Sequence, residues 1–265
     1  MKRFLNKVVW ITGASSGIGE ATVYEFAKEG AKLVISARRE EELLRVKKNT
    51  NLPEADILVL PIDVEKQGEF PAKVNQVVKH FGTIDVLFNN AGISQRSSVL
   101  ESDMEVYHKI MEINFFGVVA LTKAVLPIML KQKSGSIAVT SSVSGKLGTP
   151  MRSGYCATKH ALHGFFDSLR AEVWKENINI TIICPGYIRT SISINAISGD
   201  GSKHGRMDQN QATGISPEDC AENIVNAIAK GKEEVYIGRK EVLGVYLKRF
   251  FPRILSKIMR NQMPK

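Results

Sequence analysis

The sequence has few cysteines and no long hydrophobic run. Its three cysteines, Cys156, Cys184 and Cys220, include no CxxC pair, and their odd number favours reduced thiols in a cytoplasmic protein over a disulfide framework. The longest apolar runs, such as residues 115–121, fall short of the roughly 18–20 residues that a membrane span requires. About six residues precede the first β-rich run, so we expect no signal or transit peptide.

Low-complexity segments and short internal repeats are absent as well. With 43% hydrophobic and 24% charged residues, the composition excludes a disordered, collagen-like or coiled-coil chain. A length of 265 residues suits one large α/β domain. We therefore expect a single domain over residues 1–265, with its core at 7–237 and a C-terminal extension at 238–265.

Acidic residues are missing from the end of the chain. Residues 246–265 hold six basic residues and no acidic one, so the net charge of +9 falls to +3 for the rest of the sequence. The basic excess is therefore mostly a property of this tail and says little about the body of the protein. We expect no nucleic-acid partner.

Seven short runs rich in β-branched residues alternate with segments of helical period. The runs lack strict apolar–polar alternation, which suits parallel strands buried on both faces. The expected strands are 7–12, 32–36, 57–61, 84–88, 136–140, 178–184 and 234–237. The expected helices are 17–29, 40–48, 67–81, 104–131, 154–175 and 217–229. This alternation predicts right-handed βαβ units and a doubly wound α/β fold, in which the weakly periodic segment 191–211 forms a mobile loop or lid.

A glycine-rich turn connects the first strand to the first helix. It reads TGASSGIG over residues 12–19, with glycines at 13, 17 and 19. Glycine allows a tight turn and leaves no Cβ where a pyrophosphate approaches a helix N-terminus. The spacing differs from the commoner GxGxxG, but the position between strand and helix predicts a dinucleotide site. The alternative is a tight turn without a ligand.

The end of the second strand indicates which nucleotide the site prefers. Enzymes that use NAD place a carboxylate there, about 20 residues beyond the glycines, to bind the ribose 2′-hydroxyl. This sequence has Arg38 and Arg39 instead, and a guanidinium pairs well with a 2′-phosphate. Ser15 and Ser16 can donate to the same phosphate, so we favour NADP(H). The alternative is that both arginines belong to a solvated helix start.

Tyr155 and Lys159 are the strongest candidates for catalysis. They lie four residues apart in a helical segment and therefore share one face. A tyrosine that acts as acid and base near neutral pH needs a lowered pKa, which a nearby ammonium provides. Ser142 follows the fifth strand, where active-site residues gather in open α/β sheets. The Tyr–Lys pair alone would fit a surface helix equally well, so the combination with Ser142 carries the prediction.

Taken together, these features resemble the short-chain dehydrogenase/reductase family. The resemblance runs from about residue 7 to 237 and combines several motifs in the family's order. These are TGASSGIG at 12–19, NNAG at 89–92, Asn114, Ser142, YCATK at 155–159 and PGYIRT at 185–190. The resemblance implies a seven-stranded parallel sheet in the order 3-2-1-4-5-6-7, with the cofactor across the carboxyl ends of the strands.

The same resemblance implies the role of each catalytic residue. Tyr155 would be the general acid that protonates a carbonyl oxygen, and its phenolate the base in the reverse direction. Ser142 would hold and polarise the substrate oxygen. Lys159 would lower the tyrosine pKa and bind the nicotinamide ribose. Asn114 would kink its helix and hold a water that links Lys159 to solvent.

Cofactor contacts are implied in the same way, beginning with Arg38 as the residue that selects NADP. Asp63 would bind the adenine, with Val64 beside it. The remaining contacts are the turn residues Gly13, Ser15, Ser16, Gly17, Ile18 and Gly19; Asn90, Ala91 and Gly92 at the adenine ribose; and Pro185, Gly186, Ile188 and Thr190 at the nicotinamide carboxamide.

Four neighbouring polar residues invite other interpretations. Ser141 adjoins Ser142, but it should face the opposite way along the strand end. Cys156 is interpreted as a packed small side chain. His160 and His163 lack a partner set at metal-ligand spacing, so we expect packing or surface roles and no metal site.

The C-terminal segment predicts an amphipathic helix that begins at Pro252. On it Ile254, Leu255, Ile258 and Met259 share one side, while Arg253, Lys257 and Arg260 share the other. Leu247, Phe250 and Phe251 add apolar surface ahead of it. Such a helix suits peripheral binding to anionic lipid. The plainer alternative, which we prefer, is that the apolar side docks on the protein body or on a second subunit.

The sequence therefore predicts an NADP(H)-dependent oxidoreductase that acts on the carbonyl or secondary alcohol of a hydrophobic small molecule. An NADP(H)-binding sensor or scaffold is the alternative. The substrate pocket would come from residues 93–99, 146–152 and 191–211, with Leu147, Met151 and Ile192 as an apolar wall. The family resemblance implies a homodimer or homotetramer, and we expect a cytoplasmic protein, with peripheral membrane contact if the tail binds lipid.

Overall fold

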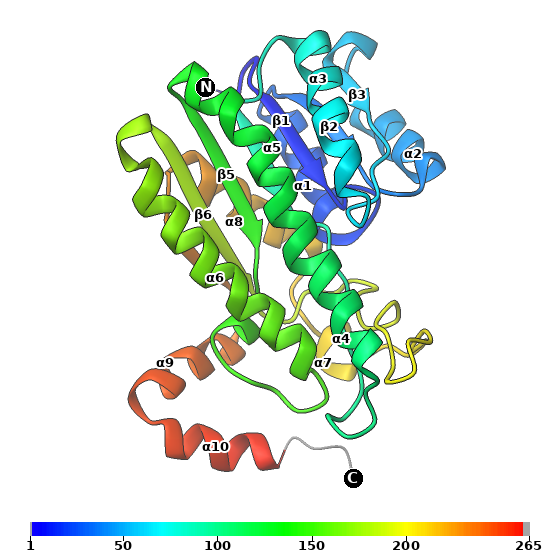
Figure 1. Cartoon of the computed structure of the whole chain (residues 1–265), viewed down its shortest axis with the longest axis vertical. Helices are drawn as coiled ribbons and strands as arrows, with labels where there is room; N and C mark the ends of the chain where they lie inside the picture. Colours follow the sequence, from blue (N-terminus) through cyan, green and yellow to red (C-terminus); the bar gives the residue numbers. More distant parts are fainter. Residues whose placement is uncertain (1, 262–265) are drawn as a thin grey trace.

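The computed structural model describes residues 2–261 and contains one seven-stranded parallel sheet (Figure 1). The strands are β1 (Val8–Thr12), β2 (Lys32–Ser36), β3 (Ile57–Val59), β4 (Val86–Asn89), β5 (Gly135–Thr140), β6 (Ile178–Pro185) and β7 (Glu234–Ile237). Their order is β3-β2-β1-β4-β5-β6-β7, and every pair is parallel. The expected doubly wound fold and its strand order are confirmed.

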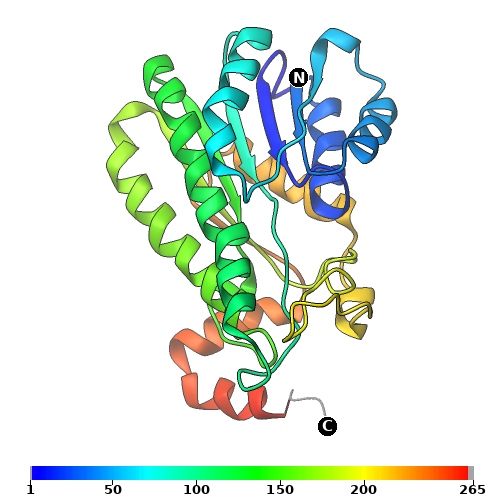
Figure 2. The same ribbon diagram turned by 45° about the vertical axis from the view of Figure 1, so that its right-hand side comes forward.

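Helices cover both faces of the sheet (Figure 2). One face carries α1 (Gly17–Lys28), α2 (Glu40–Thr50) and α8 (Pro217–Ala229). The other carries α3 (Phe70–Phe81), α5 (Gly117–Gln132) and α6 (Ser153–Val173). Each face has its own apolar core, which explains why the strands read as nearly continuous hydrophobic runs: all five residues of β1 are buried.

The helix expected over 104–131 is interrupted near its middle. α4 (Met104–Met111) leads into a π-helical turn (Glu112–Phe116) that holds Asn114, and α5 continues from it. Met104–Gln132 is long and apolar enough to cross a membrane by length and composition alone. Its inner side packs into the core through Leu121, Val125 and Met129, as in a core helix of a folded domain. That the protein forms a homodimer or homotetramer stays a prediction.

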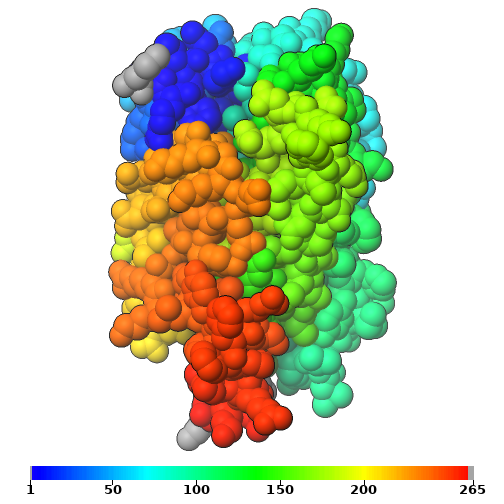
Figure 3. All heavy atoms as spheres, turned by 90° about the vertical axis from the view of Figure 1, so that its left-hand side faces the viewer, coloured from blue at the N-terminus to red at the C-terminus, as the bar shows by residue number. Residues whose placement is uncertain are grey.

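The C-terminal extension folds back over the carboxyl ends of the strands. α9 (Leu243–Phe250) precedes α10 (Pro252–Arg260), which starts at the expected proline. Leu255 of α10 is buried and packs with Val143 and Leu147 of the segment after β5. These two helices project from one end of the molecule (Figures 1 and 3). The last part of the predicted tail, residues 262–265, lies outside the described residues.

The segment expected as a lid forms ordered turns beside the same end of the sheet (Figure 2). Ile197 pairs with Gln95, and Ile188 pairs with Ile215. The short helix α7 (Gln209–Ala212) closes the segment. The lid and the C-terminal helices therefore flank the carboxyl edge of the sheet from two sides, which is where ligands bind in open α/β folds.

Candidate active site

A groove of about 550 Å³ runs along the carboxyl ends of the strands. Most of the expected nucleotide contacts line it. They are Gly13, Ser15, Ser16, Gly17, Ile18, Arg38, Asp63, Val64, Asn90, Ala91, Gly92, Tyr155, Lys159 and Thr190. Segments that are far apart in the sequence thus contribute to one elongated surface.

The glycines of the first turn have different structural tasks. Gly13 and Gly17 adopt positive φ angles of 66° and 58°, which side-chain-bearing residues rarely adopt. Gly19 does not line the groove. A Cβ at Gly19 would lie 2.1 Å from the carbonyl oxygen of Gly13, so this glycine allows the helix to pack closely against the turn. That Gly19 also contacts the nucleotide stays a prediction.

The N-terminus of α1 can receive an anion. Ser16, the residue before the helix, makes no side-chain cap hydrogen bond, so the first backbone N–H groups of the helix have no partner from its side chain. Arg38 and Arg39 are exposed at the groove, and neither forms an ion pair within residues 2–261. Free N–H groups together with unpaired guanidinium groups fit a phosphorylated dinucleotide.

A second, more apolar cavity of about 440 Å³ adjoins the groove. Ser142, Pro185, Gly186 and Ile188 line this cavity and not the groove, while Thr140, Tyr155 and Thr190 line both. Tyr155 therefore lies where the two spaces meet. The expected wall residues Leu147 and Ile192 line the cavity, but Met151 does not; it sits in a tight turn with a positive φ of 62°.

Tyr155 and Ser142 face each other across this junction. Burial raises the pKa of Tyr155, while the Ser142 hydroxyl and the charges of Arg152 and Arg96 act to lower it. The Ser142 hydroxyl donates to the Pro185 carbonyl at 3.3 Å and accepts from the Ser144 backbone N–H at 3.1 Å. Those contacts hold the serine oxygen in place beside the tyrosine.

Lys159 lies one helical turn beyond Tyr155 and is fully buried. Its Nζ donates to the Thr140 carbonyl at 2.7 Å and lies 5.6 Å from the centre of the Tyr155 ring. Burial lowers the pKa of Lys159 to about 8.

Asn114 acts through the backbone and not through either cavity. Its side-chain oxygen accepts from the Ile93 N–H at 2.8 Å, and its side-chain nitrogen donates to the Ile93 carbonyl at 2.9 Å. The same nitrogen donates to Thr158 Oγ1 at 3.2 Å. Asn114 thereby joins the strand-end loop to α6, and the π-helical turn brings its amide to that position.

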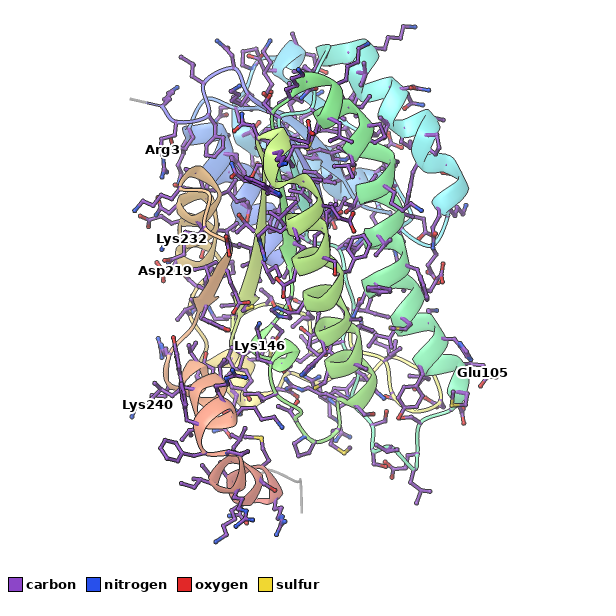
Figure 4. All side chains as sticks on the ribbon, turned by 60° about the vertical axis from the view of Figure 1, so that its left-hand side comes forward. Arg3, Glu105, Lys146, Asp219, Lys232 and Lys240 are labelled. Atoms are coloured by element: carbon purple, nitrogen blue, oxygen red, sulfur yellow. The ribbon has the colours of Figure 1, made fainter. Side chains whose placement is uncertain are left out.

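Ser141 also lines the cavity, but its hydroxyl is engaged by α6. Its hydroxyl donates to the Lys159 carbonyl at 3.1 Å and lies 3.0 Å from His163 Nε2. His163 also approaches Cys184 and Glu234, so three possible metal ligands lie together. Glu234 is already paired with Lys146 at 2.7 Å, and burial raises the pKa of the Cys184 thiol. This grouping corrects the expectation that His163 lacks a partner set at metal-ligand spacing, because residues far apart in the sequence meet where α6, β6 and β7 pack together. Figure 4 shows Lys146 where the sheet meets the C-terminal helices.

The other two side chains questioned in the sequence also belong to α6. Cys156 is buried, with its sulfur 3.5 Å from the Thr149 hydroxyl, and His160 is exposed with its Nδ1 2.8 Å from the Cys156 carbonyl. Both match the packing and surface roles that we expected.

The predicted pocket segments contain an ionic cluster that their sequence did not indicate. Arg96 and Arg152 line the cavity beside Tyr155, and both pair with Asp208. Sequence reasoning missed one group of cavity residues, which comes from the C-terminal extension and comprises Leu243, Gly244, Leu247, Leu255, Ile258 and Met259. The helical spacing of Leu255, Ile258 and Met259 was the available signal, but it does not say which surface they cover.

Known proteins resemble this chain in sequence and in structure. A family model described as short chain dehydrogenase matches residues 7–200. The Dehydrogenase/reductase SDR family protein 7-like of Anopheles gambiae is 44% identical over 99% of this chain and 85% of its own length. The Dehydrogenase/reductase SDR family member 7 of Homo sapiens is 42% identical over 92% of this chain and 74% of its own length.

Two solved structures carry nicotinamide nucleotides. A short chain dehydrogenase/reductase from Burkholderia phymatum in complex with NAD has a TM-score of 0.83 at 25% identity, covering 100% of this chain and 98% of that one. The alcohol dehydrogenase of the archaeon Thermococcus sibiricus, complexed with 5-hydroxy-NADP, has a TM-score of 0.75 at 27% identity, covering 89% of this chain and 97% of that one. A nicotinamide cofactor is therefore supported for this fold.

The buried ammonium of Lys159 should make the folded protein less stable. The pKa of Lys159 is about 8, against 10.5 for an exposed lysine, so between these pH values the unfolded chain binds more protons and stability rises with pH. Lys159→Met removes this buried charge and also one hydrogen bond. The net effect should be an increase in the free energy of unfolding of about 1–3 kcal/mol below pH 8. The increase should disappear above about pH 10.5. Urea unfolding of the variant and the wild type, below pH 8 and above about pH 10.5, measures this difference in the free energy of unfolding.

The exposed Lys131 of α5 provides the control, because Lys131→Met removes a charge without relieving burial. A stability gain for Lys159→Met that is the same at low and high pH would contradict the assignment of a destabilising buried ammonium.

Proposed function

The chain belongs to the short-chain dehydrogenase/reductase family, and from this premise we propose that it is an NADP(H)-dependent carbonyl reductase or alcohol dehydrogenase for hydrophobic substrates. As a member of this family it is an oxidoreductase. The choice of nucleotide, the reacting group and the class of substrate belong to our proposal.

One observation carries this proposal: Tyr155 lines both the nucleotide groove and the apolar cavity. A proton donor at that junction can serve a substrate in the cavity while a nicotinamide lies in the groove. Ser142 lines the cavity and Lys159 lines the groove. Ser142 is therefore placed to contact the substrate, Lys159 to contact the cofactor, and Tyr155 to contact both.

A bound nicotinamide would supply or accept the hydride. The Tyr155 hydroxyl gives its proton to the carbonyl oxygen, and in the reverse direction its phenolate takes the proton of the alcohol. The Ser142 hydroxyl turns its proton from the Pro185 carbonyl to the same oxygen as negative charge develops there. Lys159 holds positive charge next to the phenolate, and Asn114 keeps the helix of Tyr155 aligned with the loop after β4.

Three features of the groove support NADP(H) over NAD(H). Arg38 and Arg39 stand exposed directly after β2, where an NAD enzyme would have a carboxylate. Ser15 and Ser16 line the same end of the groove. A 2′-phosphate would pair with a guanidinium that has no competing acidic partner within residues 2–261.

The sensor or scaffold alternative explains less of the structure. It accounts for the nucleotide groove but not for the adjoining cavity, nor for a tyrosine, a serine and a lysine that converge between the two spaces. We therefore favour the enzyme.

We also propose that the C-terminal helices rest on an anionic lipid surface. Their docked side lines the cavity, but Phe250 and Phe251 are 68% and 57% exposed and Ile254 is 50% exposed. Lys248, Arg249, Arg253 and Lys257 surround these apolar side chains, and no acidic residue follows Glu241. Exposed aromatic residues beside unopposed cations complement a negatively charged bilayer. Such contact would place a cytoplasmic enzyme where lipophilic substrates dissolve.

The nucleotide preference is tested by titrating the protein with NADPH and with NADH while following nicotinamide fluorescence. Wild-type protein should bind NADPH more tightly. Arg38→Ala should weaken NADPH binding by about 10–100-fold, because a charge-assisted hydrogen bond is lost, and should change NADH binding by less than about threefold. Arg39→Ala serves as the neighbouring comparison. Tighter binding of NADH by the wild type would refute the preference.

Tyr155→Phe separates an enzyme from a sensor. The substitution removes only the hydroxyl, so NADPH affinity should stay within about twofold while the reduction of hydrophobic ketones and aldehydes falls by about 10²–10⁴-fold. Tyr24→Phe on the outer side of α1 is the matched control and should retain full activity. Undiminished turnover by Tyr155→Phe would rule out its role as general acid.

Lipid contact is tested by co-sedimentation with vesicles of phosphatidylcholine, with and without phosphatidylserine. The wild type should bind the anionic vesicles, and K248Q/R249Q/R253Q/K257Q should lose that binding. Four exposed lysines on the other helices give a charge-matched control, K79Q/K109Q/K123Q/K131Q. Equal loss in both variants, or association between protein molecules without vesicle binding, would contradict a lipid-binding tail.

A further inference from the structure

Two arginines on the wall of the apolar cavity form a charged cluster with one aspartate. Arg96 lies between β4 and α4, Arg152 immediately precedes α6, and Asp208 ends the lid segment. Both arginines line the cavity, and both act on the pKa of Tyr155. The cluster is therefore part of the space in which the substrate would react.

The two arginines differ in how their donors are used. Arg96 is fixed: its Nε donates to Asp208 Oδ2 at 2.8 Å, and its Nη1 donates to Ser94 Oγ at 2.8 Å and to the Gln95 carbonyl at 2.6 Å. Arg152 makes a single side-chain hydrogen bond to any of residues 2–261, from its Nη2 to Asp208 Oδ2 at 3.0 Å. Most N–H groups of its guanidinium therefore have no hydrogen-bond partner among these residues.

Charge in this cluster does not balance. Two guanidinium groups share one carboxylate, and the side chains of Arg96 and Arg152 are only 8% and 17% exposed. Glu241 lines the same cavity, but its carboxylate accepts the backbone N–H groups of Tyr187 and Arg239. A largely buried positive charge without a partner is costly, and an anionic ligand would relieve that cost.

We propose that Arg152, held in place by Asp208 and Arg96, binds an anionic group of the substrate. The ligand would be an amphiphilic carbonyl compound with a carboxylate or a phosphate, because guanidinium pairs with either in a bidentate manner. Its apolar part has a complementary surface in Leu147, Leu247, Leu255 and Met259. This inference rests on the proposed function and specifies the substrate class of the same site.

The test compares oxodecanoic acids, with the carbonyl at successive positions, with their methyl esters, using NADPH as reductant. For at least one carbonyl position the wild type should show a kcat/KM at least tenfold higher for the acid than for the ester. Arg152→Gln should lower the value for the acid at least tenfold more than the value for the ester. Any effect of Arg152 on Tyr155 acts on both substrates and cancels in this ratio.

Arg206→Gln is the matched control, because Arg206 is an exposed arginine on the same lid that does not line the cavity. It should leave the acid-to-ester ratio unchanged. Ester reduction without any preference for the acid would overturn the inference and leave the proposed function intact. No turnover of any acid or ester by protein that binds NADPH would contradict both.

A binding experiment distinguishes the two anions. Decanoate, decyl phosphate and decanol are compared as competitive inhibitors of ester reduction. The anion that inhibits at the lower concentration shows whether a carboxylate or a phosphate is recognised. Arg152→Gln should weaken inhibition by that anion at least tenfold. Inhibition by decanol equal to that by both anions would refute an anion site.

Discussion

The site depends on how Lys159 is tied to the end of β5. Its ammonium donates to the carbonyl of Thr140, and its own backbone carbonyl accepts from the hydroxyl of Ser141. These two hydrogen bonds run in opposite directions between the helix and the strand end, so they fix both the rotation and the position of α6 against the sheet. Tyr155, one turn earlier on that helix, is thereby held between the nucleotide groove and the apolar cavity.

Positive charge gathers around this junction. Lys159 is buried, Arg96 is nearly so, and Arg152 is mostly covered, while Asp208 supplies one carboxylate for both arginines. Burial lowers the pKa of Lys159 and of Arg96, since removing water penalises the charged form. A region of this kind favours groups that carry or develop negative charge, namely a phenolate, a carbonyl oxygen that receives hydride, or an anionic ligand.

Two segments outside the sheet supply much of the surroundings of the junction. The lid supplies Ile192 and Gln211, and the C-terminal helices supply a large part of the apolar wall. The sheet and the nucleotide turn therefore define a general chemistry, while these two segments define what the cavity accepts. Because α9 and α10 also carry the exposed aromatic and basic side chains, the cavity wall and the proposed lipid-facing surface belong to the same two helices.

Much of the fold and part of the site follow from local sequence signals. Buried parallel strands require short apolar runs, and a helix places residues four apart on one face, so the seven strands, the nucleotide turn and the Tyr155–Lys159 pair were all predictable. The π-helical turn at Asn114 required the family resemblance, because a kink leaves little trace in hydrophobic periodicity.

Tertiary structure decided what local patterns cannot encode. Arg96 and Asp208 are 112 residues apart in the sequence, and the local sequence around either residue does not indicate that the two side chains pair. The docked side of the C-terminal helices was visible as an amphipathic pattern, but only folding selected Val143 and Leu147 as its contacts. The sequence alone determined the scaffold and the type of catalytic groups, since both depend on local geometry. The shape and charge of the cavity depend on long-range contacts, and these exist only once the chain has folded.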